Sequence, residues 1–358
     1  MAGSDKSTVK VIKQKHSKRS KKKTSQNKNE TQRIIKIYYT NVRSLKNKIN
    51  ELKIMAAAAK PDIIALTETW LHDDIGNSEI NIDSYSLIRK DRHRVANSRG
   101  GGVAFYIKDN IRVHTLSEND DRSLEMIWLE IATSIKNDPL VIGLYYRAPN
   151  INIQDSDVIN KSIKDYCTKN TIIIGDFNHP NIDWKTMQPN GDTLCKKFIK
   201  TVNDNFLRQL VKNSTRGDNI LDLILTNNTD KINDVQVECP LSNSDHNSIV
   251  FTVNSDTEKV HQNKRVFIDY ENGDYEGMKS YLSDINWADV FNAYNIEDNW
   301  KQFKSIINTA SDKYIPTRIF TSNSNSIAKK PKWLSSKIDR LIARRNAKWK
   351  QFSKKKLR

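Results

Sequence analysis

Short apolar runs alternate with stretches of helical periodicity between residues 34 and 256. Such runs, rich in β-branched and aromatic residues, predict strands at 34–39, 62–66, 103–107, 126–131, 140–145, 171–174, 221–225 and 249–251. Apolar residues recur at helical spacing from Leu45 to Ala56, and 155–168 and 192–206 are further predicted helices. Because strands and helices mix without regular βαβ repetition, the pattern predicts a layered α/β domain rather than a doubly wound sheet.

The two ends of the chain differ from this body in composition. Residues 1–33 are rich in Lys, Ser, Thr, Asn and Gln, which predicts a disordered tail. After residue 257 the strand pattern weakens, and helices are predicted over 275–315 and, with a basic character, over 333–352. We therefore divide the chain into a basic tail at 1–33, a folded domain at 34–256 and a helical extension at 257–358 with a basic C-terminus.

Charge is separated along the chain. Of the net charge of +17, residues 1–33 carry +9 (11 Lys/Arg against 2 acids) and residues 329–358 carry +12 (13 against 1), which leaves −4 for the body. Basic ends of this kind commonly bind phosphate backbones, although a solvated tail is the simpler alternative. The run Lys18–Lys23 is also a candidate nuclear import signal.

Composition argues against several classes of protein. No segment approaches the about 18 consecutive apolar residues of a membrane-spanning helix, and the N-terminus lacks the apolar core of a secretion signal. The cysteines Cys167, Cys195 and Cys239 contain no CxxC pair, so they predict neither a disulfide framework nor a zinc site. We expect a protein of a reducing compartment with no membrane partner.

Polar residues stand where predicted strands end. Asp176 and Asn178 follow the strand at 171–174, with Gly175 freeing the backbone to turn; an Asx-turn is the alternative. Glu68 follows the strand at 62–66 and Asn41 ends the first strand, although a solvated glutamate and a strand-terminating asparagine are equally ordinary. These positions place side chains in a crevice beyond the strands.

One histidine is a candidate for chemistry. His246 follows Ser244 and Asp245 just before the last strand, although a lone histidine is more often structural. Asp222 lies within an apolar strand, and a buried carboxylate needs a cationic partner, which predicts a His246–Asp222 pair. Oxygen ligands with one imidazole favour a hard cation such as Mg²⁺ over zinc. With basic flanks, this set indicates phosphodiester hydrolysis.

Six strings carry a resemblance in sequence and in order. They are Asn41–Leu45, Thr67–Leu71, Gly100–Ala104, Tyr146–Pro149, Gly175–Trp184 and Thr215–Thr226. Together they resemble the endonuclease/exonuclease/phosphatase superfamily, and within it the apurinic endonuclease-like nuclease of non-LTR (LINE) retrotransposons of the jockey and chicken-repeat groups. The resemblance covers residues 34–256, whereas 257–358 are similar to the linker that precedes reverse transcriptase.

The resemblance implies a fold and an activity. The fold is a four-layer α/β sandwich, two packed mixed β-sheets flanked by helices. The activity is Mg²⁺-dependent nicking of DNA, with Mn²⁺ as an alternative cofactor, leaving a 3′-hydroxyl that primes reverse transcription in the nucleus. Element RNA is a further expected partner of the basic ends. The polymerase signature Tyr/Phe-Ala-Asp-Asp is absent, so we expect a nuclease portion alone.

The resemblance also implies roles for individual residues. They are Asn41, Glu68 and Asp245 for the metal, Tyr146, Asp176, Asn178, Asp222 and His246 for catalysis, and Arg147, Thr215 and Ser244 for the phosphate. Asp176 would position the attacking water, and His246, oriented by Asp222, would contact the scissile phosphate. Asp245 would support the metal or the histidine. Tyr146 would contact the phosphate, with Tyr145 on the other face of its strand.

The sequence departs from the family pattern at two places, and the first, at position 43, weakens an abasic-site repair interpretation. Position 43 is Arg, where repair enzymes of this fold usually carry Asp or Asn, and the Tyr146–Pro149 string is one residue longer than theirs. The alternatives are an abasic-site repair nuclease, a phosphatase of lipids or inositol phosphates, and a decayed nucleic-acid-binding remnant. The intact acidic set argues against the remnant.

Overall fold

The structure is a computed structural model that describes residues 33–92, 100–116, 124–133, 139–168, 170–191, 193–255, 263–292, 295–322 and 334–356. The predicted disordered tail at 1–33 lies outside these residues apart from Arg33, which begins the first strand, and the run Lys18–Lys23 and the predicted domain boundary at 256 lie outside them too. No helix in the described ranges is long and apolar enough to cross a membrane.

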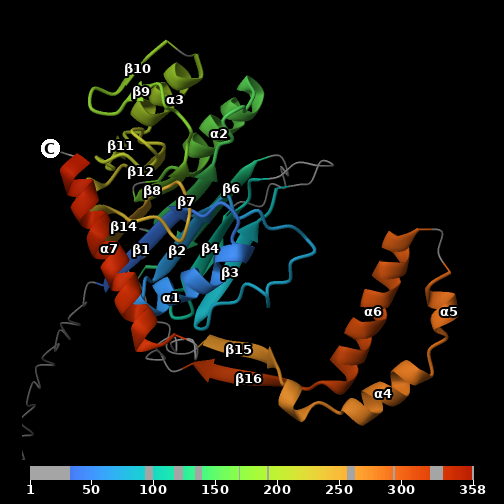
Figure 1. Cartoon of the computed structure of the whole chain (residues 1–358). Coiled ribbons are helices and arrows are strands. Elements are labelled where there is room, and N and C mark those ends of the chain that lie inside the picture. Colours follow the sequence, from blue (N-terminus) through green and yellow to red (C-terminus); the bar gives the residue numbers. More distant parts are fainter. Residues whose placement is uncertain are drawn as a thin grey trace, which may run out of the picture. The chain divides into compact units, whose positions relative to one another are not determined.

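The first large sheet has six strands in the order β13-β14-β1-β2-β4-β3 (Figure 1). Their bounds are β1 (Arg33–Asn41), β2 (Ile63–Thr67), β3 (Tyr85–Lys90), β4 (Val103–Lys108), β13 (Ile232–Glu238) and β14 (Ser248–Ser255). β1 and β2 are parallel and are connected by η1 (Lys46–Lys48) and α1 (Ile49–Ala59), whereas the other pairs are antiparallel.

The second large sheet has six strands in the order β11-β12-β8-β7-β6-β5. Their bounds are β5 (Val113–Thr115), β6 (Glu125–Ile131), β7 (Leu140–Tyr146), β8 (Thr171–Asp176), β11 (Arg208–Gln209) and β12 (Asp222–Thr226). The parallel strands β7 and β8 are connected by α2 (Ile153–Tyr166). The hairpin of β9 (Ile182–Asp183) and β10 (Gln188–Pro189) and helix α3 (Thr193–Asp204) follow β8, and η2 (Thr229–Lys231) precedes β13.

Three apolar cores hold the layers together. Side chains such as Phe105 and Ile142 fill the space between the two sheets. Leu52 of α1 packs on the outer face of the first sheet, and Phe198 of α3 packs with Trp128 on the outer face of the second. Fully burying each such side chain contributes about 1.5–3 kcal/mol. The predicted four-layer sandwich is therefore confirmed, in the order helix, sheet, sheet, helices.

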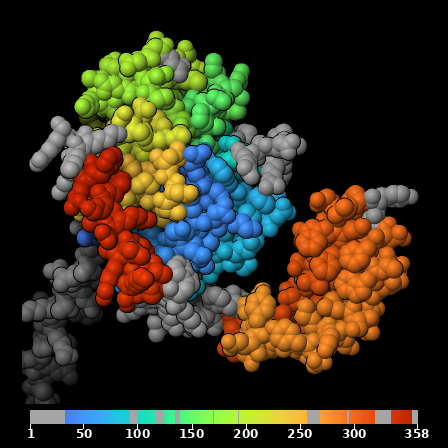
Figure 2. Space-filling model, in the orientation of Figure 1, coloured from blue at the N-terminus to red at the C-terminus, as the bar shows by residue number. Residues whose placement is uncertain are grey.

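Strands from the two ends of the domain lie next to each other in the first sheet. β1 pairs with β14 from Arg33–Ser255 to Tyr39–Ile249. In Figure 2 the segments up to residue 255, coloured yellow to orange, accordingly lie against the blue N-terminal segments on one face. This pairing brings the residues that follow β1 close to those that precede β14.

The C-terminal elements include a two-stranded antiparallel sheet that the sequence pattern did not predict. It consists of β15 (Asn263–Ile268) and β16 (Thr317–Ser322). Between its strands lie η3 (Tyr270–Asn272), α4 (Tyr275–Ser283), α5 (Trp287–Val290) and α6 (Ile296–Tyr314), and α7 (Ser336–Lys356) follows. The helices predicted over 275–315 and 333–352 are present, apart from the residues that are not described. The Phe291 ring stacks on those of Trp287 and Phe303, which are tilted relative to each other.

Candidate active site

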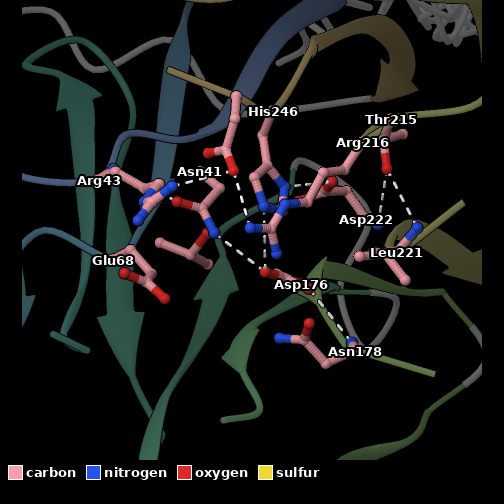
Figure 3. A network of polar contacts seen from close by, with 12 residues as sticks. Asn41, Arg43, Glu68, Asp176, Asn178, Thr215, Arg216, Leu221, Asp222 and His246 are labelled. Carbon is pink, nitrogen blue, oxygen red and sulfur yellow. Dashed lines mark hydrogen bonds and ion pairs between the residues drawn. The ribbon is translucent and has the colours of Figure 1, made fainter. Parts of the chain in front are cut away.

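Polar side chains from both large sheets meet along one seam, where strands of the two sheets end (Figure 3). Asn41 ends β1 and Glu68 follows β2 in the first sheet, while Tyr146 and Asp176 end β7 and β8 in the second. Asp222 begins β12 and is paired in register with Asp176. The Asn41 amide donates a hydrogen bond to the Asp176 carboxylate across the seam at 2.9 Å. The sequence-predicted residues at these strand ends therefore share one site.

The predicted pair of His246 and Asp222 is present. His246 Nδ1 lies 2.8 Å from Asp222 Oδ2, and both side chains are buried. Burial lowers the pKa of His246, but the hydrogen bond to Asp222 and the charges of Asp222 and Asp176 outweigh it, so the pKa is raised. The other ring nitrogen, Nε2, lies 3.9 Å from Asp176 Oδ2.

Asp176 is the most strongly perturbed acid of the seam. Its carboxylate accepts hydrogen bonds from the Asn41 amide and from the Asn178 backbone N–H. Burial and the charge of Asp222 nevertheless raise its pKa to about 8. A carboxyl group with a pKa near neutrality is suited to exchange a proton during a reaction.

Glu68 is held by two donors. The Tyr146 hydroxyl donates to Oε1, and the Trp70 indole N–H donates to Oε2 at 2.6 Å. The Arg92 guanidinium lies over the Tyr146 ring, with its Cζ atom 5.6 Å from the ring centroid. Tyr145 points to the opposite face, where its hydroxyl contacts Ser162, so the predicted alternation of the two tyrosines is confirmed. The carboxylate orientation at Glu68 is thus fixed by both sheets.

Three residues predicted to bind phosphate are buried and bound to backbone groups. The Thr215 hydroxyl accepts from the N–H groups of Leu221 and Asp222, at 3.1 Å each. Ser244 donates to the Asn41 carbonyl at 2.7 Å, and Arg147 donates to the Asn178 carbonyl at 3.0 Å. These contacts shape the loops of the seam. A direct contact with phosphate stays a prediction.

Two other predicted residues have partners of their own. Asn178 Nδ2 donates to the Arg147 carbonyl at 2.8 Å. The Asp245 carboxylate, predicted to support the metal or the histidine, forms ion pairs with Arg43 and Arg216 at 2.9 and 2.8 Å. Its charge also contributes to the raised pKa of His246. Asp245 therefore lies at the edge of the seam, bound to cations of the chain itself.

Three residues of the seam were not predicted. The Tyr39 hydroxyl donates to Asp222 at 2.7 Å, Trp70 holds Glu68, and Lys48 is buried with its ammonium on the carbonyls of Val42 and Arg43. Tyr39 stands two residues before Asn41 in an extended strand and so points to the same side, a signal that could have identified it. Lys48 lies within a predicted helix and gave no such signal.

The donor set of the seam fits a divalent cation. Among the described residues, Asp176, Asp222 and His246 offer ligand atoms that all lie within 4.8 Å of one another. Asn41 and Glu68 add an amide and a carboxylate at the same seam. Two neighbouring buried carboxylates, one with a raised pKa, are an arrangement that a bound cation would stabilise. These three clustered residues were predicted as catalytic, whereas the predicted metal ligands are Asn41, Glu68 and Asp245.

The chain is similar to known proteins in part of its sequence and in its fold. Residues 140–250 match the family described as endonuclease-reverse transcriptase. The endonuclease domain of TRAS1, a telomere-specific non-LTR retrotransposon, is similar with a TM-score of 0.50 and 16% identity, covering 63% of this chain and 100% of that domain. AP endonuclease LMAP from Leishmania major gives a TM-score of 0.50 and 16% identity over 62% of this chain and 88% of its own. No curated protein sequence matches significantly.

Proposed function

We propose, for a chain that resembles the endonuclease/exonuclease/phosphatase superfamily and its retrotransposon endonucleases, that it is a metal-dependent endonuclease that nicks DNA. The product would carry a 3′-hydroxyl that primes reverse transcription. The observation that carries the proposal is the buried Asp222–His246 pair, in which His246 Nε2 lies 3.9 Å from Asp176 Oδ2. An imidazole of raised pKa beside a carboxyl group of raised pKa provides a proton donor and a proton acceptor for hydrolysis of a phosphodiester.

His246 and Asp176 take complementary parts in the proposed reaction. Asp222 accepts from Nδ1 and leaves the Nε2–H of His246 to donate to an oxygen of the scissile phosphate. The protonated His246 side chain would then stabilise the negative charge that develops on the pentavalent phosphate. Asp176 accepts a proton from the attacking water and orients it, with Asn178 beside it. The Tyr146 hydroxyl, on Glu68, lies on the opposite side of the seam and contacts the phosphate.

Asn41 and Glu68 are proposed to hold Mg²⁺, for which Mn²⁺ can substitute. A bound divalent cation supplies charge neutralisation at the phosphate and at the leaving oxygen. The chain's own part is to keep the Glu68 carboxylate oriented, through the Trp70 and Tyr146 donors. The proposed substrate is nuclear DNA, with element RNA as a second ligand of the basic ends.

Nicking of supercoiled plasmid tests the proposal. The full chain should convert plasmid to open circles in Mg²⁺ and stop in EDTA. His246→Ala should lower the rate by about 10³-fold or more, because it removes a positioned cation from the charge-developing phosphate. Asn247→Ala, one residue along, is a matched control that should retain most activity. Absence of nicking by folded wild-type chain, or nicking that survives His246→Ala, would contradict the proposal.

An abasic-site repair nuclease is the second candidate function, favoured by the shared fold with AP endonuclease LMAP. Cleavage of an intact duplex and of the same duplex with one abasic site separates the two. We expect comparable rates, because Arg43 replaces the Asp or Asn usual in repair enzymes. A preference of 100-fold or more for the abasic duplex would favour repair. Extension of the nick by a DNA polymerase would demonstrate the 3′-hydroxyl.

A further inference from the structure

Two arginines from distant loops share one carboxylate at the edge of the seam. Arg43 Nη1 lies 2.9 Å and Arg216 Nη2 2.8 Å from the same oxygen, Asp245 Oδ2. In Figure 3 the two arginines approach from opposite sides of His246, the residue next to Asp245. Each guanidinium carries five N–H donors, so one contact with Asp245 leaves most of them for another acceptor.

Both arginines are accessible from solvent. Their side chains are 44% and 42% exposed, and that of Asp245 is 37% exposed. By contrast, Arg147 is 4% exposed and bound to backbone carbonyls inside the site. Two guanidinium groups and one carboxylate leave a net charge of +1 at the surface beside His246. This combination favours an anion, and the planar guanidinium fits two oxygens of a phosphate.

The backbone holds Arg43 in place. Arg43 has a φ of +39°, a conformation that few non-glycine residues adopt. The Lys48 ammonium donates to the carbonyls of Val42 and Arg43 at 2.7 Å each, and the Ser44 N–H donates to the Glu68 carbonyl at 3.0 Å. The buried Lys48 ammonium thus fixes the backbone of the loop that carries Arg43.

The backbone holds Arg216 equally well. Arg216 and Asn219 close a tight turn through reciprocal hydrogen bonds of 3.1 and 3.0 Å. The Asn247 N–H donates to the Thr215 carbonyl at 2.7 Å, which ties this turn to the segment of Asp245 and His246. Both guanidinium groups are therefore preorganised relative to His246, so that a ligand need not order them.

We propose that Arg43 and Arg216 together bind the backbone phosphate next to the scissile phosphate of the nucleic acid, and that Asp245 positions the two guanidinium groups instead of ligating the metal. The inference rests on the proposed function, since it assigns a second phosphate of the same substrate. It also gives Asp245 a different role from the one that the family resemblance implies.

Salt-dependent binding of the full chain to a fluorescent DNA duplex in EDTA tests the phosphate site. The double variant Arg43→Gln/Arg216→Gln should lower the magnitude of the slope of log K against log[salt] by about 0.9, the value for one phosphate contact, and each single variant should lower it by less. Lys46→Gln is the matched control, because Lys46 is an exposed cation three residues from Arg43 that pairs with Glu79. Slopes equal to that of wild type in both arginine variants would overturn the inference.

The binding readout separates this inference from the proposed function. A wild-type chain that binds DNA without cutting it, with the expected slopes in the variants, would refute the endonuclease and keep the phosphate site. Nicking by the wild-type chain with unchanged salt slopes in the arginine variants would support the endonuclease and refute the phosphate site.

Asp245→Asn tests the second half of the inference. The variant should bind Mn²⁺, followed by electron paramagnetic resonance, with wild-type affinity, because the Asp245 carboxylate is paired with the two arginines. The exposure of Asp245 makes loss of folding a minor concern, and circular dichroism checks it. A tenfold loss of Mn²⁺ affinity with unchanged DNA binding would show that Asp245 is a metal ligand and would overturn the inference.

Discussion

Asp176 is the residue at which stability and chemistry conflict. Burial and the Asp222 charge raise its pKa to about 8, so between pH 4 and pH 8 the folded chain retains a proton that the unfolded chain releases. The free energy of unfolding therefore falls as the pH rises through this window. The raised pKa of His246 acts in the same direction, because its contribution is lost as pH rises through the folded-state value.

Asp176→Asn should abolish nicking and stabilise the chain at alkaline pH. In EDTA at pH 8 we expect a gain of roughly 1–3 kcal/mol, since an uncharged amide avoids the cost of a buried carboxylate beside Asp222. The gain should shrink towards pH 4, where Asp176 is protonated. Urea unfolding at several pH values measures it. Asp204→Asn, at a half-exposed ion pair of α3, is the control; an identical pH dependence in both variants would contradict the prediction.

Residue types within apolar strands made part of the site predictable. Asp222 and Asp176 stand out because a carboxylate in an apolar strand demands a partner, and the partner of Asp222 is His246. The Asp245 contacts with Arg43 and Arg216 had no such signal. These three residues are ordinary surface charges in the sequence, and only the folded loops bring them within 3 Å.

The parallel pair β7 and β8 is the element on which the second half of the site depends. Gly175 lies in register with Tyr145 on the neighbouring strand. A Cβ atom at Gly175 would collide with the Tyr145 carbonyl oxygen, and backbone cannot yield as a side chain can. The glycine therefore sets the distance between the strands that carry Tyr146 and Asp176.

Gly175→Ala should destabilise the domain by about 1–3 kcal/mol, in the range of overpacked cores, and lower nicking by displacing Asp176. Gly76→Ala is the matched control, because the nearest atom to its Cβ would be 3.4 Å away. Chemical denaturation of both variants measures the difference. Equal stabilities would mean that β7 and β8 separate without strain.

Edge strands were the elements that the sequence did not reveal. β3 and β13 pair on one side only and carry polar residues, as in Ile-Asn-Asp-Val-Gln-Val-Glu, so neither reads as an apolar run. β15 and β16 pair across the intervening helices, and no local pattern reports such a partner. The central strands were found because both of their faces are buried.

At the scale of the whole molecule, composition and the order of motifs carried the prediction. The mixture of strands and helices predicted layers, whereas the two packed sheets followed from the family resemblance. The strand order could not be read locally, since β1 lies between β2 and β14. Charge is a second property of the whole chain, with basic ends flanking a body of net −4.

Removal of residues 1–33 and 329–358 should flatten the salt dependence of DNA affinity by several units of slope, because these segments hold 24 of the 59 Lys and Arg residues. Fluorescence anisotropy over a salt series measures it, with Lys18–Lys23 changed to Gln in the full chain as a milder variant. A slope unchanged from that of wild type would show that the ends are solvated tails or import signals.

The seam joins the beginning of the domain to its end. Ser244 donates to the carbonyl of Asn41, 203 residues away, and β1 pairs along its length with β14. During translation β1 therefore emerges long before the strand that completes its sheet. A nascent chain has no cationic imidazole beside Asp222 until His246 has been added. Products of premature termination before that point would therefore lack the Asp222–His246 pair on which the proposed function depends.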